Sequence, residues 1–428
     1  YMKKLKYLII VFYIMPVILA FFYIYLFSVN VPFWDEWELV PYFDKFYSRN
    51  LTWSDLFAQH SDHIIFFPRI LILIIGILSK YNTVIEIYFT MGFFLLSLII
   101  IFLIIKNQCN INPVSFWLIP LPYLIFSWRQ YELFLTGFNI QFLMVYFFTI
   151  TGFYSIYLCQ KQYSIIYFIS ALISGTVASF SGTMGLFIWP AGFIQLMILS
   201  KKKLYPVFWS ITGILAWTVF LLNYKKPDNS SDIFYFSHRI PEFLNYFLTC
   251  LGTSLFWDKS TALIWAVIFF ILLSLCIFLI CKYKRLNENS FWVAMLIFSF
   301  LTVLSISAGR LNSGIEQAFT PRYTVFSLMA VTALYCMFLD LLHYSKKNFI
   351  KILTVFLFLI IFAGLPCSYG LGLKAGMLNK KDRTRMTHLL LTYETQSDDT
   401  LKILYAPDGV VRQRAEILKK WGWSVFSR

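Results

Sequence analysis

The chain has 428 residues, of which 59% are hydrophobic and only 13% are charged, and its formal net charge is +15. Soluble domains carry about 25% charged residues, so this composition excludes an ordinary soluble protein and indicates a polytopic membrane protein. The basic residues are scattered between apolar segments, which argues against nucleic-acid binding and favours contact with anionic membrane lipids.

Apolar runs recur along the chain, and a run of about 20 residues can cross the roughly 30 Å of hydrocarbon in a bilayer. We therefore expect an all-α fold with about eleven transmembrane helices, at 7–29, 84–105, 113–128, 140–159, 164–180, 186–200, 204–223, 260–281, 291–308, 322–342 and 348–366. Lysine and arginine clusters mark alternate helix ends as cytoplasmic. The first helix follows "KKLK", so it leads outward.

The first outer loop, 30–83, opens with "VPFWDEW". Asp35 and Glu36 stand there between Trp34 and Trp37. Tryptophan favours the membrane interface, so this motif places two adjacent acids at the membrane surface. A solvated helix cap is the simpler alternative to a catalytic role.

The stretch 60–79 of the same loop begins with "HSDH" and contains Arg69. It either spans the membrane or lies in the interface, and we expect an amphipathic interfacial helix. His60 and His63 would share one helical face, but no clear third ligand accompanies them, so hydrogen bonding is favoured over a metal site. The seven cysteines form no CxxC pair, so neither a zinc site nor a disulfide framework is predicted.

Under this topology, further polar residues gather on the outer face. The candidates beyond the first loop are Arg129, Glu132 and Asn139 in "WRQYELFLTGFN" and Arg310, Arg322 and Tyr323 in "GRLNSGIEQAFTPRY". Each arginine could instead be an interfacial anchor. Together, a carboxylate can take a proton from a sugar hydroxyl, and arginines can hold a phosphate by charge-assisted hydrogen bonds. This combination suggests glycosyl transfer from a lipid-phosphate sugar.

The sequence also resembles a known family. "FWDEW" and "QHSDHIIFFPR" are similar to motifs of GT-C glycosyltransferases that use polyprenyl-phosphate sugars, and more narrowly to Gtr-type, seroconverting glucosyltransferases that modify O-antigen. The further matching stretches are "RQYELFLTGFNIQF" (129–142), "SFSGTMGLFIWPAG" (179–192), "SAGRLNSGIEQAFTPRY" (307–323) and "LYAPDGVVRQRAEILKKWGWSVF" (404–426). Where the family usually has "HNEHR", this chain has "HSDHI", so the arginine is replaced by Ile64.

The resemblance implies a GT-C-like fold and a first-loop carboxylate acting as general base with inversion. Carried over by position, that base is Asp35 or Glu36; we favour Asp35, with Glu36 orienting it. The donor phosphate would be bound by Arg310, Arg322, Arg129 and Arg69. The substrate-binding candidates are Trp34, Trp37, His60, Asp62, His63, Glu132, Asn139 and Tyr323. No cofactor is required, although a divalent metal is compatible with the chemistry.

The implied donor is an undecaprenyl-phosphate hexose, most simply glucose, and the acceptor is O-antigen of lipopolysaccharide or another envelope glycan. A polyprenyl-phosphate sugar synthase and a small flippase would be partners. The implied location is the bacterial inner membrane with the site facing the periplasm. We expect a transmembrane domain, 1–366, and a small extracytoplasmic segment, 367–428, with a strand at 402–405 and a helix at 409–420. An O-antigen polymerase or ligase, or a flippase of lipid-linked sugars, remains the alternative.

Overall fold

The computed structural model describes residues 2–109, 111–112, 114–199, 202–222, 224–226, 235–407 and 409–427. Over these ranges the chain is almost entirely helical, and the only sheet among them is one two-stranded hairpin. The all-α architecture predicted from composition is therefore confirmed. The predicted helix ends at 200 and 223 lie outside the described residues.

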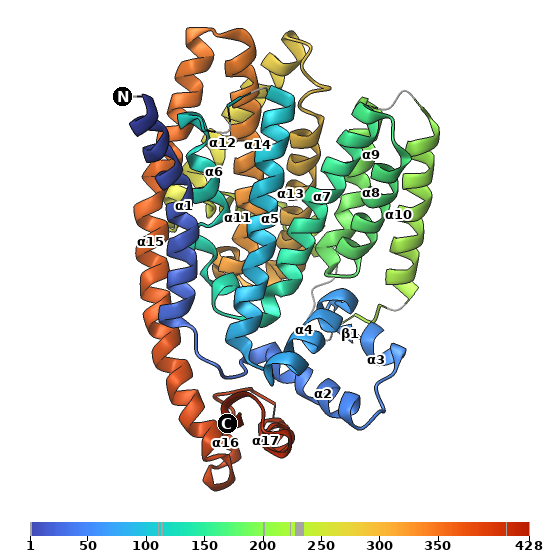
Figure 1. The fold of residues 1–428 in the computed structure, drawn as a ribbon, viewed down its shortest axis with the longest axis vertical. Coiled ribbons are helices and arrows are strands. Elements are labelled where there is room, and N and C mark those ends of the chain that lie inside the picture. The colour runs from blue at the N-terminus through green and yellow to red at the C-terminus, as the bar shows by residue number, and fades with distance from the viewer. Residues whose placement is uncertain are drawn as a thin grey trace.

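Eight helices within these ranges are long and apolar enough to cross a membrane. They are α1 (Met2–Phe27), α5 (Thr83–Cys109), α7 (Ile140–Gln162), α10 (Leu204–Leu222), α12 (Lys259–Lys282), α13 (Ser290–Arg310), α14 (Thr324–Ser345) and α15 (Asn348–Leu391). Figure 1 shows them running in roughly one direction as a bundle. The chain is thus a multi-pass membrane protein.

Three predicted spans are shorter helices: α6 (Pro120–Ile125), which follows the 3-10 turn η2 (Phe116–Leu118), α8 (Ile165–Ser179) and α9 (Ile188–Leu199). α8 and α9 have 15 and 12 residues. At 1.5 Å per residue they measure about 22 and 18 Å, less than the hydrocarbon thickness of about 30 Å. The count of eleven spans therefore stays a prediction.

The loop at 30–83, called the first outer loop after its predicted side of the membrane, folds into short elements at one end of the bundle (Figure 1). They are η1 (Trp34–Leu39), α2 (Val40–Tyr47), α3 (Trp53–Phe57), β1 (Gln59–His60), β2 (His63–Ile64) and α4 (Phe66–Ser79). α4 has 14 residues and measures about 21 Å, less than the hydrocarbon thickness, so its place in the interface stays a prediction. The remaining connecting elements are η3 (Trp128–Phe134), η4 (Gly137–Asn139), η5 (Thr183–Phe187), η6 (Tyr235–His238), α11 (Ile240–Gly252), η7 (Leu311–Ser313), η8 (Ile315–Phe319) and η9 (Pro321–Tyr323).

One prediction for this loop is wrong: His60 and His63 do not share a helical face. They pair across the β1–β2 hairpin, where His60 lies opposite His63. Ser61 at the tip has a positive φ of 50°, which lets the chain reverse within two residues. The histidines are therefore held by backbone pairing rather than by helical periodicity.

The C-terminal segment also differs from expectation. α15 continues for 44 residues through Pro366, so the predicted domain boundary at 366/367 falls inside one continuous helix. The predicted strand at 402–405 is wrong, because residues 402–404 form a turn after α16 (Asp398–Leu401). The predicted helix at 409–420 is confirmed as α17 (Val410–Trp421). Short 3-10 turns, η10 (Tyr393–Thr395) and η11 (Ser424–Phe426), flank this region.

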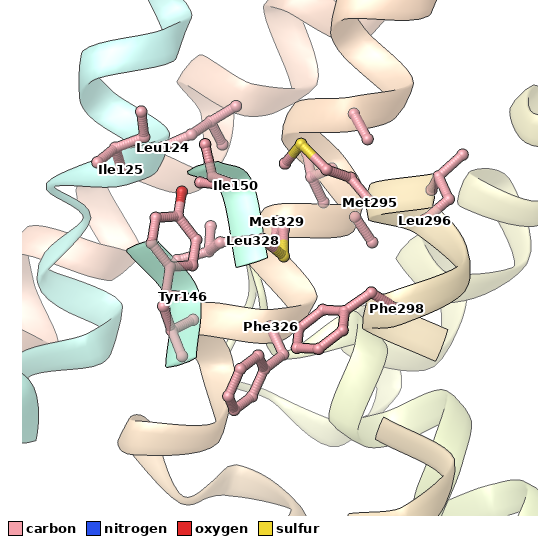
Figure 2. Packing of buried hydrophobic residues seen from close by; sticks show 14 of the residues in the cluster. Leu124, Ile125, Tyr146, Ile150, Met295, Leu296, Phe298, Phe326, Leu328 and Met329 are labelled. Atoms are coloured by element: carbon pink, nitrogen blue, oxygen red, sulfur yellow. The ribbon is translucent and has the colours of Figure 1, made fainter. Parts of the chain in front are cut away.

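The interior of the bundle is built around α14, because 94% of the residues in its apolar stretch are buried. Figure 2 shows Phe326 and Met329 of α14 between Tyr146 of α7 and Phe298 of α13. In lipid no hydrophobic force drives helices together, so close packing of this kind supplies the stability.

A second apolar cluster joins the first outer loop to the C-terminal segment. The ring centroids of Phe43 on α2 and Trp423 lie 4.8 Å apart. The backbone N–H of Ser424 donates to the carbonyl of Lys80. Charged contacts reinforce it, because Arg414 binds Glu38 through two hydrogen bonds of 2.9 and 3.1 Å. The C-terminal segment therefore packs directly against the loop that carries Asp35 and Glu36.

Candidate functional site

A cavity of about 290 Å³ opens where the first outer loop meets the end of the bundle. Its walls come from η1, the β1–β2 hairpin, η3, η4, the start of α7, the end of α13, η9 and α15. The predicted site residues that line it are Trp34, Asp35, His60, Asp62, His63, Glu132, Asn139, Arg310, Arg322 and Tyr323. Residues from Phe33 to Arg383 thus meet in one cavity, whose lining is both polar and apolar.

Asp35 is the most accessible acid of the cavity, with its side chain 53% exposed. Nε2 of His60 lies 3.6 Å from Oδ2 of Asp35. Partial burial of the Asp35 carboxylate alone would raise its pKa. The contact with His60 and the charge of Arg322 outweigh that effect and lower the pKa. Asp35 is thus an ionised carboxylate whose oxygen atoms can reach a ligand.

A second acid, Asp62, sits at the hairpin tip within a network of its own. Nη2 of Arg310 approaches Oδ2 of Asp62 at 3.3 Å, and Nε2 of His63 lies 3.5 Å from Oδ1. Nδ1 of His63 is 2.8 Å from the hydroxyl of Thr183. Burial lowers the pKa of His63 despite the adjacent Asp62, so this imidazole is neutral at pH 7. Of the two basic side chains beside Asp62, only Arg310 is therefore charged.

The third charged pair, Arg322 with Glu132, joins η9 to η3. Nη1 of Arg322 donates to Oε2 of Glu132 at 2.9 Å, and the guanidinium also lies over the ring of Tyr323. Asn139 donates to the carbonyl of Glu132 at 2.8 Å and thereby fixes the η3 backbone. Arg322 is held at the cavity wall by one carboxylate, with its side chain 26% exposed.

Glu36 occupies a different environment from its neighbour. It is fully buried, and its two carboxylate oxygens accept the backbone N–H groups of Gly137 and Phe33, both at 2.8 Å. Nη1 of Arg383 lies 3.6 Å from Oε2 of Glu36. Burial raises the pKa of Glu36, while Arg383 and the backbone donors oppose that rise. Glu36 fastens η1 to η4 and does not line the cavity.

Three other candidates also lie away from the cavity. Trp37 is fully buried in the cluster beneath η1. Arg69 is buried and donates to the carbonyls of Asp55, Leu56 and Ala58. Arg129 is buried, donates to the carbonyl of Phe319 and stacks on Trp257. None of the three lines the cavity, so phosphate binding by Arg69 and Arg129 stays a prediction.

Sequence reasoning missed Arg383, which lines the cavity together with Asn379 of the same helix. Arg383 also donates to the hydroxyl of Thr136 and the carbonyl of Val31, at 3.0 and 3.3 Å. Its signal was present, since "NKKDRTR" follows an apolar run. We missed Arg383 because the last predicted span ended at 366. In the structure α15 continues past that point and brings Asn379 and Arg383 to the first loop.

Each histidine of the cavity lies beside one aspartate, His60 beside Asp35 and His63 beside Asp62. Within the described ranges, no group of three or more histidine, cysteine, aspartate or glutamate side chains could hold a metal ion. What the arrangement offers chemically is a carboxylate base near two arginines that can bind an anion.

No protein-family model matches the chain. A protein of Archaeoglobus fulgidus, described only as an uncharacterized protein, is 28% identical over 212 residues. The match covers 46% of this chain and 52% of that protein, so the chain spans about half the length of the relative it matches.

Proposed function

We propose that this protein is a glycosyltransferase that moves a hexose from a polyprenyl phosphate to a glycan hydroxyl, at the outer face of the membrane that it spans. One observation carries the proposal: a single cavity joins an accessible carboxylate, Asp35, to two arginines, Arg310 and Arg322, from distant parts of the chain. Such a pairing of base and anion site is what transfer from a phosphate leaving group requires.

The donor phosphate would be held by Arg310 and Arg322. Both side chains are partly exposed, at 35% and 26%, and each is paired to one carboxylate, Asp62 or Glu132. A guanidinium has five donor N–H groups, so each arginine can bind a phosphate oxygen while keeping or exchanging its carboxylate partner. α13 and η9 place both at the end of the bundle, where a lipid phosphate lies.

Asp35 would accept the proton of the acceptor hydroxyl. The hydroxyl oxygen forms the new bond to the anomeric carbon while the bond from that carbon to the phosphate oxygen breaks. The polyprenyl phosphate departs with the electron pair and needs no protonation, because it is a weak base. Attack opposite to the leaving phosphate inverts the anomeric configuration. The lowered pKa of Asp35 keeps the base ionised at neutral pH.

The finer assignments rest on the family resemblance. They are undecaprenyl-phosphate glucose as donor, O-antigen or another envelope glycan as acceptor, and the periplasmic face of the bacterial inner membrane as location. A polyprenyl-phosphate sugar synthase and a small flippase would supply the donor on that face.

The test is a transfer assay with purified protein, radiolabelled polyprenyl-phosphate glucose and envelope glycan, comparing wild type with Asp35→Asn. Asp399→Asn serves as the matched control, since Asp399 is an acid with a side chain 89% exposed on the C-terminal segment. We expect Asp35→Asn to abolish turnover while donor binding survives and the control stays active. Movement of the labelled lipid across a vesicle bilayer without transfer would instead favour the flippase, and full activity of Asp35→Asn would reject the mechanism.

A further inference from the structure

Trp34 has an unusual backbone and an exposed ring. Its φ is 46°, in the left-handed region that bulky residues rarely adopt. Its side chain is 55% exposed and forms part of the cavity wall. An apolar ring of this size held open in a strained conformation is a reason to look for a ligand.

The ring of Trp34 contacts Phe33, and Phe33 in turn contacts Arg383. It stacks on Phe33, with ring centroids 5.1 Å apart and planes 20° apart. The guanidinium of Arg383 lies over the same Phe33 ring, 4.2 Å from its centroid. Phe33 thus contacts both Trp34 and Arg383.

This stack is itself anchored on every side. Phe33 donates its backbone N–H to Glu36 at 2.8 Å. Arg383 is fixed by Glu36, Thr136 and the carbonyl of Val31. The buried contacts of Arg383 on α15 thus support Phe33 and, through it, Trp34, which stays 55% exposed and lines the cavity.

We propose that Trp34 is the platform of an acceptor-sugar subsite, on which the apolar face of a pyranose ring stacks beside Asp35. This deepens the proposed function and rests on it. The C–H groups of a pyranose face match the negative face of an indole. Trp34 and Asp35 line the same cavity, so a sugar ring stacked on Trp34 can present a hydroxyl to that carboxylate. The donor hexose, by contrast, is tied to the phosphate at Arg310 and Arg322.

Two other tryptophans of the same loop do not fit this role. Trp37 is fully buried. Trp53 is 72% exposed on α3 but does not line the cavity. Trp53 is equally suited to membrane anchoring, so it is a matched control for any loss that comes from anchoring alone.

The experiment measures acceptor and donor KM separately for wild type, Trp34→Ala, Trp34→Phe and Trp53→Ala. We expect Trp34→Ala to raise the acceptor KM about tenfold, the size expected for losing one stacked aromatic contact. The donor KM and kcat should stay near wild type, Trp34→Phe should lose less, and Trp53→Ala should behave as wild type. Equal acceptor KM values for Trp34→Ala and Trp53→Ala would overturn the subsite and leave the transferase proposal standing.

If wild type transfers no hexose, the proposed function fails and binding alone decides the subsite. Saturation-transfer NMR with disaccharides of rhamnose, galactose and N-acetylglucosamine would then be recorded on the same detergent-purified proteins. Sugar signals that persist in Trp53→Ala and vanish in Trp34→Ala support the platform. No sugar signal in wild type, or an unchanged signal in Trp34→Ala, overturns it.

Discussion

Asp35 and Glu36 are adjacent in the chain yet lie in opposite environments. The Asp35 side chain is 53% exposed beside His60, whereas Glu36 is completely buried and accepts backbone N–H groups of Phe33 and Gly137. They lie on the 3-10 turn η1, in which successive side chains point about 120° apart. The turn therefore separates a carboxylate that can react from one that fastens the loop, and variants of the two should fail in different ways.

His60 should set the acid limit of activity. The pKa of Asp35 is lowered because the contact with His60 and nearby positive charges outweigh desolvation. A base with a lowered pKa stays ionised, and active, to lower pH than an ordinary aspartate. In His60→Gln that support is lost and the pKa of Asp35 rises, so the acid limb of kcat/KM should move to higher pH. The pH profiles of wild type and His60→Gln check this, and coincident acid limbs would contradict it.

Glu36 and Arg383 should matter for stability first. Their side chains are 0% and 2% exposed, and removing one partner of a buried pair costs about 3–5 kcal/mol because the other charge stays buried unpaired. Glu36→Gln and Arg383→Met should each lower the thermal unfolding midpoint in detergent, and the double variant should recover part of the loss.

The control for that pair is Asp399 with Lys402, a contact between side chains 89% and 40% exposed. Exposed pairs are screened by solvent and contribute little to stability, so Asp399→Asn should leave the midpoint almost unchanged. Equal effects at the buried and exposed pairs would show that Glu36 does not fasten η1.

The sequence predicted which segments meet but not which charges face the cavity. Acids and arginines at the predicted outer ends of apolar runs should lie near one surface, and that reasoning located Asp62, Arg310 and Arg322. Arg69 and Arg129 carry the same charge, but backbone carbonyls of Leu56 and Phe319 hold them inside the fold. Which carbonyls face inward depends on tertiary packing, so no sequence pattern distinguishes these arginines from the others.

The predicted end of the last helix failed for a different reason. Proline usually ends a helix because it lacks an N–H and its ring crowds the preceding turn. α15 nevertheless passes Pro366, as helices in membranes can when neighbouring elements compensate. Gly372 and Gly376 of the same helix lie against Trp128 and Phe27. That packing carries the helix on to Arg383, which is why a site residue was missed.

The arginines should separate into two functional groups. Arg310→Gln and Arg322→Gln remove partly exposed donors to the phosphate, and a charge-assisted hydrogen bond is worth about 1.5–3 kcal/mol, or roughly 10- to 100-fold. Each should raise the donor KM by that factor and leave folding intact. Arg129→Gln should instead lower the yield of folded protein, because Arg129 is buried under Trp257.

Donor titrations on all three arginine variants, with size-exclusion profiles for folding, provide the measurement. Lysine in place of Arg322 should restore little, since a single ammonium cannot bind Glu132 and a phosphate with the planar geometry of a guanidinium. A donor KM that rises only in Arg129→Gln would move the phosphate site away from the cavity.

Cysteine labelling should test the orientation on which the outer-face site depends. Cys281 is exposed at the end of α12, next to the basic stretch "KYKR" that the positive-inside tendency places in the cytoplasm. Trp53 is exposed in the first outer loop. A membrane-impermeant maleimide should therefore label Trp53→Cys in spheroplasts and Cys281 only in inverted vesicles, with Cys281→Ser as the background. Labelling of Cys281 in spheroplasts would invert the topology and put the cavity on the cytoplasmic side, where a donor would need no flippase.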